Sequence, residues 1–396
     1  MFLATVVLLN TVATTTARPS GSLHQITSSD DATISYRLRE RRPWYRNATA
    51  TVVILPGYTS TAEQVVSWFG PAFDAIAVRT VAIDYRGFGG STGSYAASAS
   101  PTDVVYEGLR ISRLAMDARE VLRDLETRRG VTPEKTVLLG HSMGVAVWCE
   151  FLSLFGTDKY AGFAMIDQPP KFTFGAPRAA DHTFPDDFSD HDELGTWKFG
   201  LHHSTLGQFA RGAAEAALDH QDGSYPRVKA KYDAVFLSWN GCNDNPELWT
   251  DPTSLCYGFG STMKACCVTQ DQRGLDVWKA ATDGFEAING KLDGILGFND
   301  LMQDYTDVMT LIRRRGLPVF VYGGEYSLVP EEYMRWVWAV AGPGSPSSRS
   351  LFFTGSQGVH APFLNSDGSA EIFLDALATW VRDVAAAPKS ASRAEL

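Results

Sequence analysis

Short apolar runs alternate with amphipathic stretches over residues 50–168, and this alternation indicates a parallel sheet covered by helices. Four apolar runs predict buried strands, at residues 51–55, 80–84, 136–139 and 161–166. Between the second and third runs, residues 109–128 carry apolar side chains at helical spacing. Since strands that alternate with helices pair in parallel and take helices on both faces, we expect an α/β fold with a mostly parallel central sheet.

A different pattern precedes this alternation. Residues 24–40 contain two runs in which apolar and polar side chains alternate, separated by the polar turn Ser28-Ser29-Asp30-Asp31. Alternation with a period of two is typical of half-buried strands, so the segment predicts an antiparallel hairpin at an edge of the sheet.

The alternation stops near residue 168 and resumes after about residue 300. The intervening segment is rich in aromatic, glycine and polar residues and predicts a large inserted cap. Beyond it, strands at 318–322 and 350–353 and helices at 331–340 and 370–384 complete the sheet. The expected division of the chain is a signal peptide at 1–17, a first core part at 24–168, the cap at 169–299, a second core part at 300–386 and a flexible tail at 387–396.

The N-terminus has the pattern of a secretory signal peptide. An apolar stretch from Phe2 to Leu9 is followed by small residues, with cleavage expected after Ala13 or Ala17, although no basic residue precedes the stretch. The stretch is too short to span a bilayer, and no later segment reaches spanning length. We therefore expect a secreted protein without a membrane span.

The cysteines and one sequon agree with secretion. Four of the five cysteines cluster in the predicted cap: Cys242, Cys256, Cys266 and Cys267. An even cluster in a loop-rich segment predicts two disulfides, for which three pairings are possible. A zinc site is the alternative, but the cluster contains no C-x-x-C pair and no nearby histidine to support it. Cys149 is expected to be a buried thiol. Asn47 begins an Asn-Ala-Thr glycosylation sequon.

Charge excludes one class of partner. The chain of 396 residues has a net charge of −10 and no basic stripe that could neutralise phosphates, so we expect no nucleic-acid binding. The short clusters at 39–42 and 313–315 predict solvated faces.

The motif Gly-His-Ser-Met-Gly at 140–144 follows a predicted buried strand and precedes the helical run 145–155. Strand, G-x-S-x-G and helix together indicate a nucleophile elbow, a sharp turn that exposes a serine hydroxyl at the edge of a sheet. Ser142 is therefore the candidate nucleophile, and the two glycines are expected to allow a strained turn and close helix–strand packing.

A serine nucleophile needs a base, and the base needs an orienting acid. His360 lies in the loop after the strand at 350–353 and is the candidate base. Two carboxylates compete for the third position. Asp167 ends the strand after the elbow helix, and Glu325 lies in the loop after the strand at 318–322; we favour Asp167 and keep Glu325 as the alternative.

The developing oxyanion needs two N–H donors. We expect them from the backbone of Met143, directly after the nucleophile, and of Tyr58, in the loop after the strand at 51–55. Gly57 would let this backbone approach the substrate.

These residues resemble the α/β-hydrolase fold superfamily. The matching segments are LPGYTS (55–60), DYRGFGGS (84–91), ISRLAMDARE (111–120), LLGHSMG (138–144), DQPPK (167–171) and GVHAPF (358–363). Among its branches, the chain is most similar to serine esterases and to cofactor-free chloroperoxidase-like hydrolases. Haloalkane dehalogenases and epoxide hydrolases share the fold but use an aspartate nucleophile, so Ser142 argues against both. One dehalogenase branch places its acid after the strand that corresponds to 161–166, which supports Asp167.

The sequence thus predicts a secreted serine hydrolase that cleaves an ester or related acyl bond in a small molecule through an acyl-enzyme. Neither a metal nor an organic cofactor is expected. The alternatives are a serine peptidase that acts on short peptides and a relative that binds a ligand without catalysis, since a fold does not by itself imply an activity.

Overall fold

The computed structural model describes residues 21–40, 50–57, 60–92, 111–168, 305–325, 327, 329 and 331–387. The predicted signal peptide and cap lie outside these residues, as do residues 388–396 of the predicted tail, the sequon at Asn47 and Tyr58 of the predicted oxyanion loop. The four clustered cysteines, Cys242, Cys256, Cys266 and Cys267, lie outside them too.

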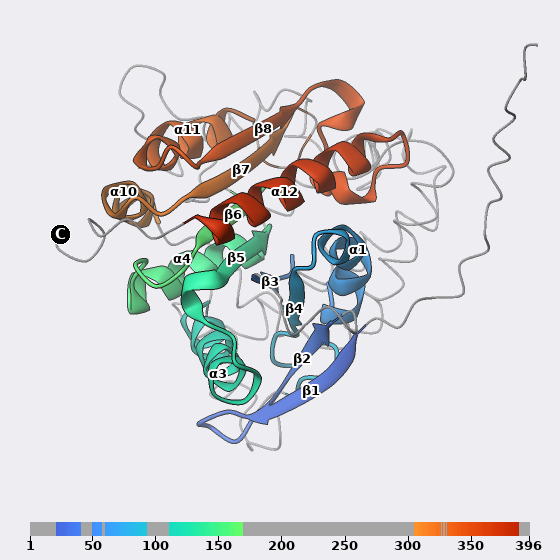
Figure 1. Cartoon of the computed structure of the whole chain (residues 1–396), viewed down its shortest axis with the longest axis vertical. Helices are drawn as coiled ribbons and strands as arrows, with labels where there is room; N and C mark the ends of the chain where they lie inside the picture. The colour runs from blue at the N-terminus through green and yellow to red at the C-terminus, as the bar shows by residue number, and fades with distance from the viewer. Residues whose placement is uncertain are drawn as a thin grey trace, which may run out of the picture.

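The described residues form one eight-stranded sheet in the order β1-β2-β4-β3-β5-β6-β7-β8, with the β1–β2 hairpin at one edge and β8 at the other (Figure 1). Strand β2 runs antiparallel to its neighbours β1 and β4, and all other pairs are parallel. This is the mostly parallel sheet predicted from the sequence. The strands are β1 (Ser22–Thr27), β2 (Thr33–Arg39), β3 (Thr51–Leu55), β4 (Arg79–Ile83), β5 (Thr136–His141), β6 (Gly162–Ile166), β7 (Val319–Gly324) and β8 (Arg349–Phe353).

Helices cover both faces of the sheet. The central strands are buried on both sides, and successive residues of β3 belong to opposite core layers, because side chains alternate along a strand. Helices α1 (Ala62–Ala75) and α12 (Ser369–Ala386) pack on one face. The other face is covered by α3 (Ile111–Arg129), α4 (Met143–Phe155), α10 (Thr306–Arg315) and α11 (Glu331–Ala341).

The predicted strands are present, with ends that differ by at most two residues from those expected. The predicted hairpin is confirmed: the Ser28 amide donates to the carbonyl of Ala32 at 2.7 Å, and Asp31 takes a left-handed φ of 64° in the turn. The cluster 313–315 forms the last turn of α10 and is largely exposed, as expected.

Among the α-helices in the described residues, α1 and α10 were not predicted. Helix α1 contains Gly70 and Pro71 in its interior, which weakens its helical pattern, but a capping box of Thr61 and Gln64 marks its start. Helix α10 lies between the predicted cap and the strand expected at 318–322, where no helix was predicted. Its end is marked by Gly316, which has a left-handed φ of 64°.

Candidate active site

Ser142 occupies the turn between β5 and α4, and its backbone is strained. Its φ of 49° and ψ of −125° are rarely adopted by a residue with a side chain. The conformation is held by two backbone hydrogen bonds: Ser142 N–H donates to Ile166 O at 2.9 Å, and Val145 N–H donates to Ser142 O at 2.9 Å. The elbow geometry expected from the motif is therefore present.

Both motif glycines are required by close approach of the backbone. A Cβ atom at Gly140 would lie 2.5 Å from Val145 N, and one at Gly144 would lie 2.1 Å from Leu55 O. Any side chain at either position would push α4 away from β5 and β3. The spacing of G-x-S-x-G thus follows from the packing of this helix on two strands.

His360 and Asp167 are in direct contact. Nδ1 of His360, in the loop after β8, lies 2.5 Å from Oδ2 of Asp167, the first residue after β6. The carboxylate is fully buried, and the imidazole side chain is 13% exposed. Because the contact requires one proton between Oδ2 and Nδ1, Nε2 of His360 is left unprotonated and able to act as a base.

Burial shapes the ionisation of this pair. Burial raises the pKa of Asp167 well above its usual value, and the hydrogen bond from Ser327 acts in the opposite direction. Burial also lowers the pKa of His360 below its usual value of 6.5, because the charged imidazolium loses its hydration. The imidazole is therefore neutral near pH 7.

Glu325, the alternative acid, is engaged elsewhere. Its Oε2 accepts a hydrogen bond from the backbone N–H of Gly355 at 2.8 Å, which ties the loop after β7 to the loop that leads to His360. The Glu325 backbone N–H also donates to Phe353 O at 2.9 Å. The structure therefore brings Asp167, and not Glu325, to Nδ1 of His360.

Two residues at the site were missed by sequence analysis. Ser327, in the loop after β7, donates its hydroxyl hydrogen bond to Oδ2 of Asp167. His141 is buried beside His360: its Nε2 lies 3.0 Å from the carbonyl oxygen of His360, and the two rings are 4.8 Å apart. The position of His141 next to Ser142 was the available indication, whereas nothing in the sequence marks Ser327.

The first residues of the predicted oxyanion loop, Pro56 and Gly57, lie against the elbow. A Cβ atom at Gly57 would lie 2.8 Å from Nδ1 of His141 and 3.3 Å from Cβ of Ser142, so only glycine fits here. The hydroxyl of Tyr85 donates to Pro56 O at 2.7 Å and holds the loop. Met143 is the first residue of α4, where a backbone N–H has no partner within the helix.

Ser142 is partly exposed. Among the described residues, no hydrogen bond joins its hydroxyl to His360. Such contacts are often long in the absence of substrate and tighten when substrate binds.

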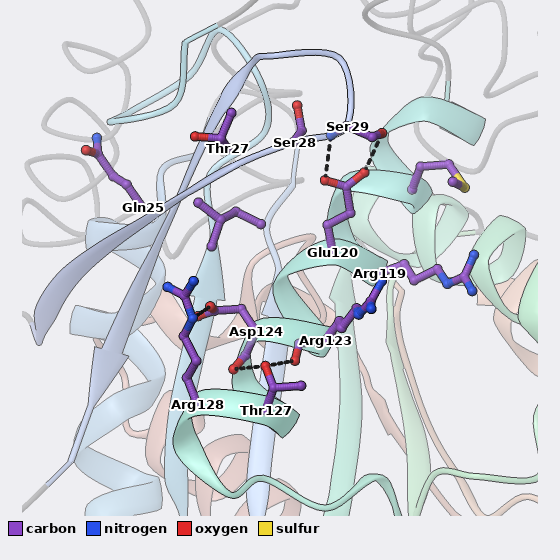
Figure 2. Close-up of a pocket in the computed structure, with 12 residues that line it drawn as sticks. Gln25, Thr27, Ser28, Ser29, Arg119, Glu120, Arg123, Asp124, Thr127 and Arg128 are labelled. Carbon is purple, nitrogen blue, oxygen red and sulfur yellow. Dashed lines mark hydrogen bonds and ion pairs between the residues drawn. The ribbon is translucent and has the colours of Figure 1, made fainter.

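A groove of about 750 Å³ lies away from this site, between β1, the β1–β2 turn and α3 (Figure 2). Both carboxylates that line it have hydrogen-bond or ion-pair partners. The backbone N–H and hydroxyl of Ser29 donate to the Glu120 carboxylate at 3.0 and 2.8 Å, and Arg128 pairs with Asp124 at 3.2 Å. We assign no ligand to this groove.

In the part of the chain that the structure describes, no group of three or more histidine, cysteine or acidic side chains could hold a metal ion. No described helix is long and apolar enough to cross a membrane.

Comparison with known proteins agrees with this architecture. A family model described as "alpha/beta hydrolase fold" matches residues 50–206, whereas no curated protein sequence matches the chain. Among solved structures, a bromoperoxidase from Bacillus anthracis superposes with a TM-score of 0.54 at 16% identity, over 91% of this chain and 100% of that one.

Two further solved structures are of proteins named for other activities. An esterase from Rhodococcus sp. ECU1013 superposes with a TM-score of 0.53 at 18% identity, over 92% of this chain and 99% of that one. A proline iminopeptidase from Mycobacterium smegmatis gives a TM-score of 0.51 at 14% identity, over 92% of this chain and 99% of that one. The sheet order, the nucleophile elbow and the family model lead to one conclusion: the chain is an α/β-hydrolase-fold protein.

Proposed function

We propose that this protein is a serine hydrolase that cleaves an ester or related acyl bond. Ser142 is the nucleophile, His360 the general base and acid, and Asp167 the acid that orients the imidazole. The backbone N–H groups of Met143 and Tyr58 bind the oxyanion. The observation that carries the proposal is the contact between His360 Nδ1 and Asp167 Oδ2. Asp167 follows β6, the strand next to β5, which ends at the Ser142 elbow.

The reaction has two halves. Nε2 of His360 takes the proton of Ser142 as Oγ attacks the substrate carbonyl, and the resulting oxyanion is held by the two N–H groups. The imidazolium then gives its proton to the leaving alcohol, which leaves an acyl-enzyme on Ser142. In the second half, His360 takes a proton from water, the hydroxide adds to the acyl carbonyl, and the proton returns to Ser142 as the acid departs.

A fluorophosphonate probe tests this proposal, because it phosphonylates an activated serine and leaves other serines unmodified. We expect the full-length protein to be labelled at Ser142, as located by peptide mass spectrometry, and to lose labelling on heat denaturation. The variant His360→Ala should lose labelling as well. The matched control is His24→Ala, which removes a histidine on β1 and should leave labelling unchanged.

The opposite result is equally informative. A folded protein that takes no label, or that labels equally well without His360, would overturn the catalytic serine. Tight binding of an acyl compound without turnover would then favour the non-catalytic alternative.

The leaving group separates the two catalytic alternatives. Two of the similar structures cited above are named as an esterase and a proline iminopeptidase, so both aryl esters of short acids and aminoacyl arylamides are suitable substrates. Turnover of the esters alone supports the esterase, whereas turnover of arylamides with a free amino terminus supports the peptidase.

We further propose that the protein is secreted. The cysteine cluster in the predicted cap and the sequon at Asn47 are the features that support this. A tagged full-length protein expressed in a secreting host should accumulate in the medium, and glycosidase treatment should lower its mass unless Asn47 is replaced by Gln.

A further inference from the structure

We propose that Ser327 is a positioning residue of the active site, whose hydroxyl holds the Asp167 carboxylate in the orientation that receives His360. This inference rests on the serine hydrolase proposed above. It assigns a function to the loop after β7, which contributes no carboxylate to the pair.

The hydroxyl of Ser327 is itself held in place. The side chain is buried, and the Ser327 backbone N–H donates to Gly324 O at 3.2 Å. The backbone N–H of Val329 donates to the Ser327 oxygen at 3.1 Å. Because that oxygen accepts from Val329, its own proton is directed to Oδ2 of Asp167, the acceptor that the described residues provide.

The carboxylate has few other anchors. Oδ2 of Asp167 receives both the Ser327 hydroxyl and Nδ1 of His360. The other oxygen, Oδ1, is buried and has no hydrogen-bond partner in the described part of the chain. Without the hydroxyl of Ser327, His360 is therefore the only described side chain that holds the carboxylate.

The hydroxyl also affects ionisation. The Asp167–His360 pair shares one proton and carries one negative charge, which the Ser327 donor stabilises. A further proton would neutralise the pair, and the Ser327 hydroxyl would then stabilise it less. The Ser327 donor therefore lowers the apparent pKa of the pair as a unit. Replacing the hydroxyl with hydrogen is expected to raise it.

Other titratable groups face the pair from neighbouring elements. Tyr322 on β7 donates its hydroxyl to Val359 O at 2.9 Å, and its pKa is raised by burial and, to a smaller extent, by Asp167. His141 on β5 packs against His360, and its pKa is lowered chiefly by burial. Glu331 on α11 also raises the pKa of Tyr322. These groups are the same in the variants compared below, so their contribution cancels.

The direct test is a titration of His360 by NMR in the full-length protein with isotope-labelled histidine, using His360→Ala to assign the resonance. In Ser327→Ala we expect the apparent pKa of His360 to rise by about one unit, the size of one hydrogen bond to a charged group. Ser327→Thr retains the hydroxyl and should restore the wild-type value.

Ser348→Ala is the matched control. It removes a second buried serine oxygen that accepts a backbone N–H, from Val319 at 3.2 Å, at the opposite end of β7. It should leave the titration of His360 unchanged, since nothing connects it to the carboxylate.

Fluorophosphonate labelling measured against pH separates this inference from the proposed function. Ser327→Ala should label about tenfold more slowly near neutral pH, with its acid limb moved to higher pH. A variant that titrates and labels like wild type, while wild type labels at Ser142, would overturn the assignment of Ser327 alone. Absence of labelling in wild type would overturn the serine hydrolase, and with it a catalytic role for Ser327, even if the titration still detected the contact.

Discussion

Asp167 and Glu325 lie in loops at the ends of neighbouring strands, yet their surroundings give them different tasks. Asp167 is buried against the imidazole, whereas Glu325 uses its carboxylate to accept a backbone N–H from Gly355. The side chain of glutamine can accept that same hydrogen bond, but asparagine at 167 removes the charge that stabilises an imidazolium. The two conservative substitutions are therefore expected to differ greatly in effect.

We predict that Asp167→Asn lowers the rate of Ser142 labelling on the order of a thousandfold, because the imidazole loses both its charge partner and its tautomer. Glu325→Gln should change the rate by less than about threefold, since the acceptor is retained. Labelling kinetics with a fluorophosphonate measure both. A large loss in Glu325→Gln together with a small one in Asp167→Asn would transfer the role of acid to Glu325.

The pH dependence follows from the burial of His360. In the proposed mechanism the neutral imidazole is the active base, and burial lowers the pKa of His360 below the usual 6.5. Activity should therefore stay level from pH 8 down to pH 6.5 and fall only at lower pH, as the folded protein takes up a proton. A plot of kcat/KM against pH for the best ester substrate measures this, and an acid limb centred above pH 6.5 would contradict it.

At the scale of elements, one buried ion network ties together three parts of the core. Arg86, in the turn after β4, is fully buried and pairs with Asp117 of α3 at 2.6 Å and with Asp30 of the β1–β2 turn at 2.7 Å. Removing only the arginine would leave the Asp117 carboxylate buried beside Arg113, its partner at 3.1 Å.

We predict that Arg86→Met lowers the free energy of unfolding by about 3–5 kcal/mol, the usual cost of breaking a buried pair. The double variant Arg86→Met with Asp117→Leu should recover part of this loss, because it also removes the buried Asp117 carboxylate, which would otherwise keep only Arg113 as a described ion-pair partner. Arg128→Met is the control: Arg128 is 73% exposed in its pair with Asp124, so its loss should cost less than about 1 kcal/mol. Urea denaturation followed by circular dichroism measures all three, and an unchanged midpoint in Arg86→Met would refute the prediction.

The strands were predictable from the sequence because a buried parallel strand is a nearly continuous apolar run, as at 51–55 and 162–166. The elbow was predictable because a strained serine and two close backbone approaches leave few residue types possible. Helix α1 was not predicted because Gly70 and Pro71 in its interior weaken its helical pattern. Ser327 could not be predicted because only the tertiary approach of its loop gives the hydroxyl a partner.

At the scale of the whole molecule, parallel pairing explains how distant residues meet. Ser142 follows β5, Asp167 follows β6, Ser327 follows β7 and His360 follows β8. These four residues come from a stretch of sequence longer than half of the chain. Because parallel strands end at the same edge of a sheet, the residues that follow them lie at that edge. Gly57, after β3, reaches that edge as well and packs against Ser142.

The predicted cap is tested best by counting reactive thiols in the intact protein. Cys149 is fully buried within α4, and burial raises the pKa of its thiol, so it should not react while the protein is folded. If the four clustered cysteines form two disulfides, alkylation followed by intact-mass spectrometry should add no group to the native protein. It should add one group after denaturation without reductant and five after denaturation with reductant, since the chain has five cysteines.

Each departure from this series has a distinct meaning. The variant Cys149→Ala should lose the single group seen after denaturation alone, which identifies the free thiol. Five groups without reductant would show that the cluster is not oxidised, and would weaken the proposal that the protein works in an oxidising compartment. Four groups on the native protein that fall in number when zinc is added would instead favour the alternative of a zinc site in the cap, because thiolates that bind zinc react slowly.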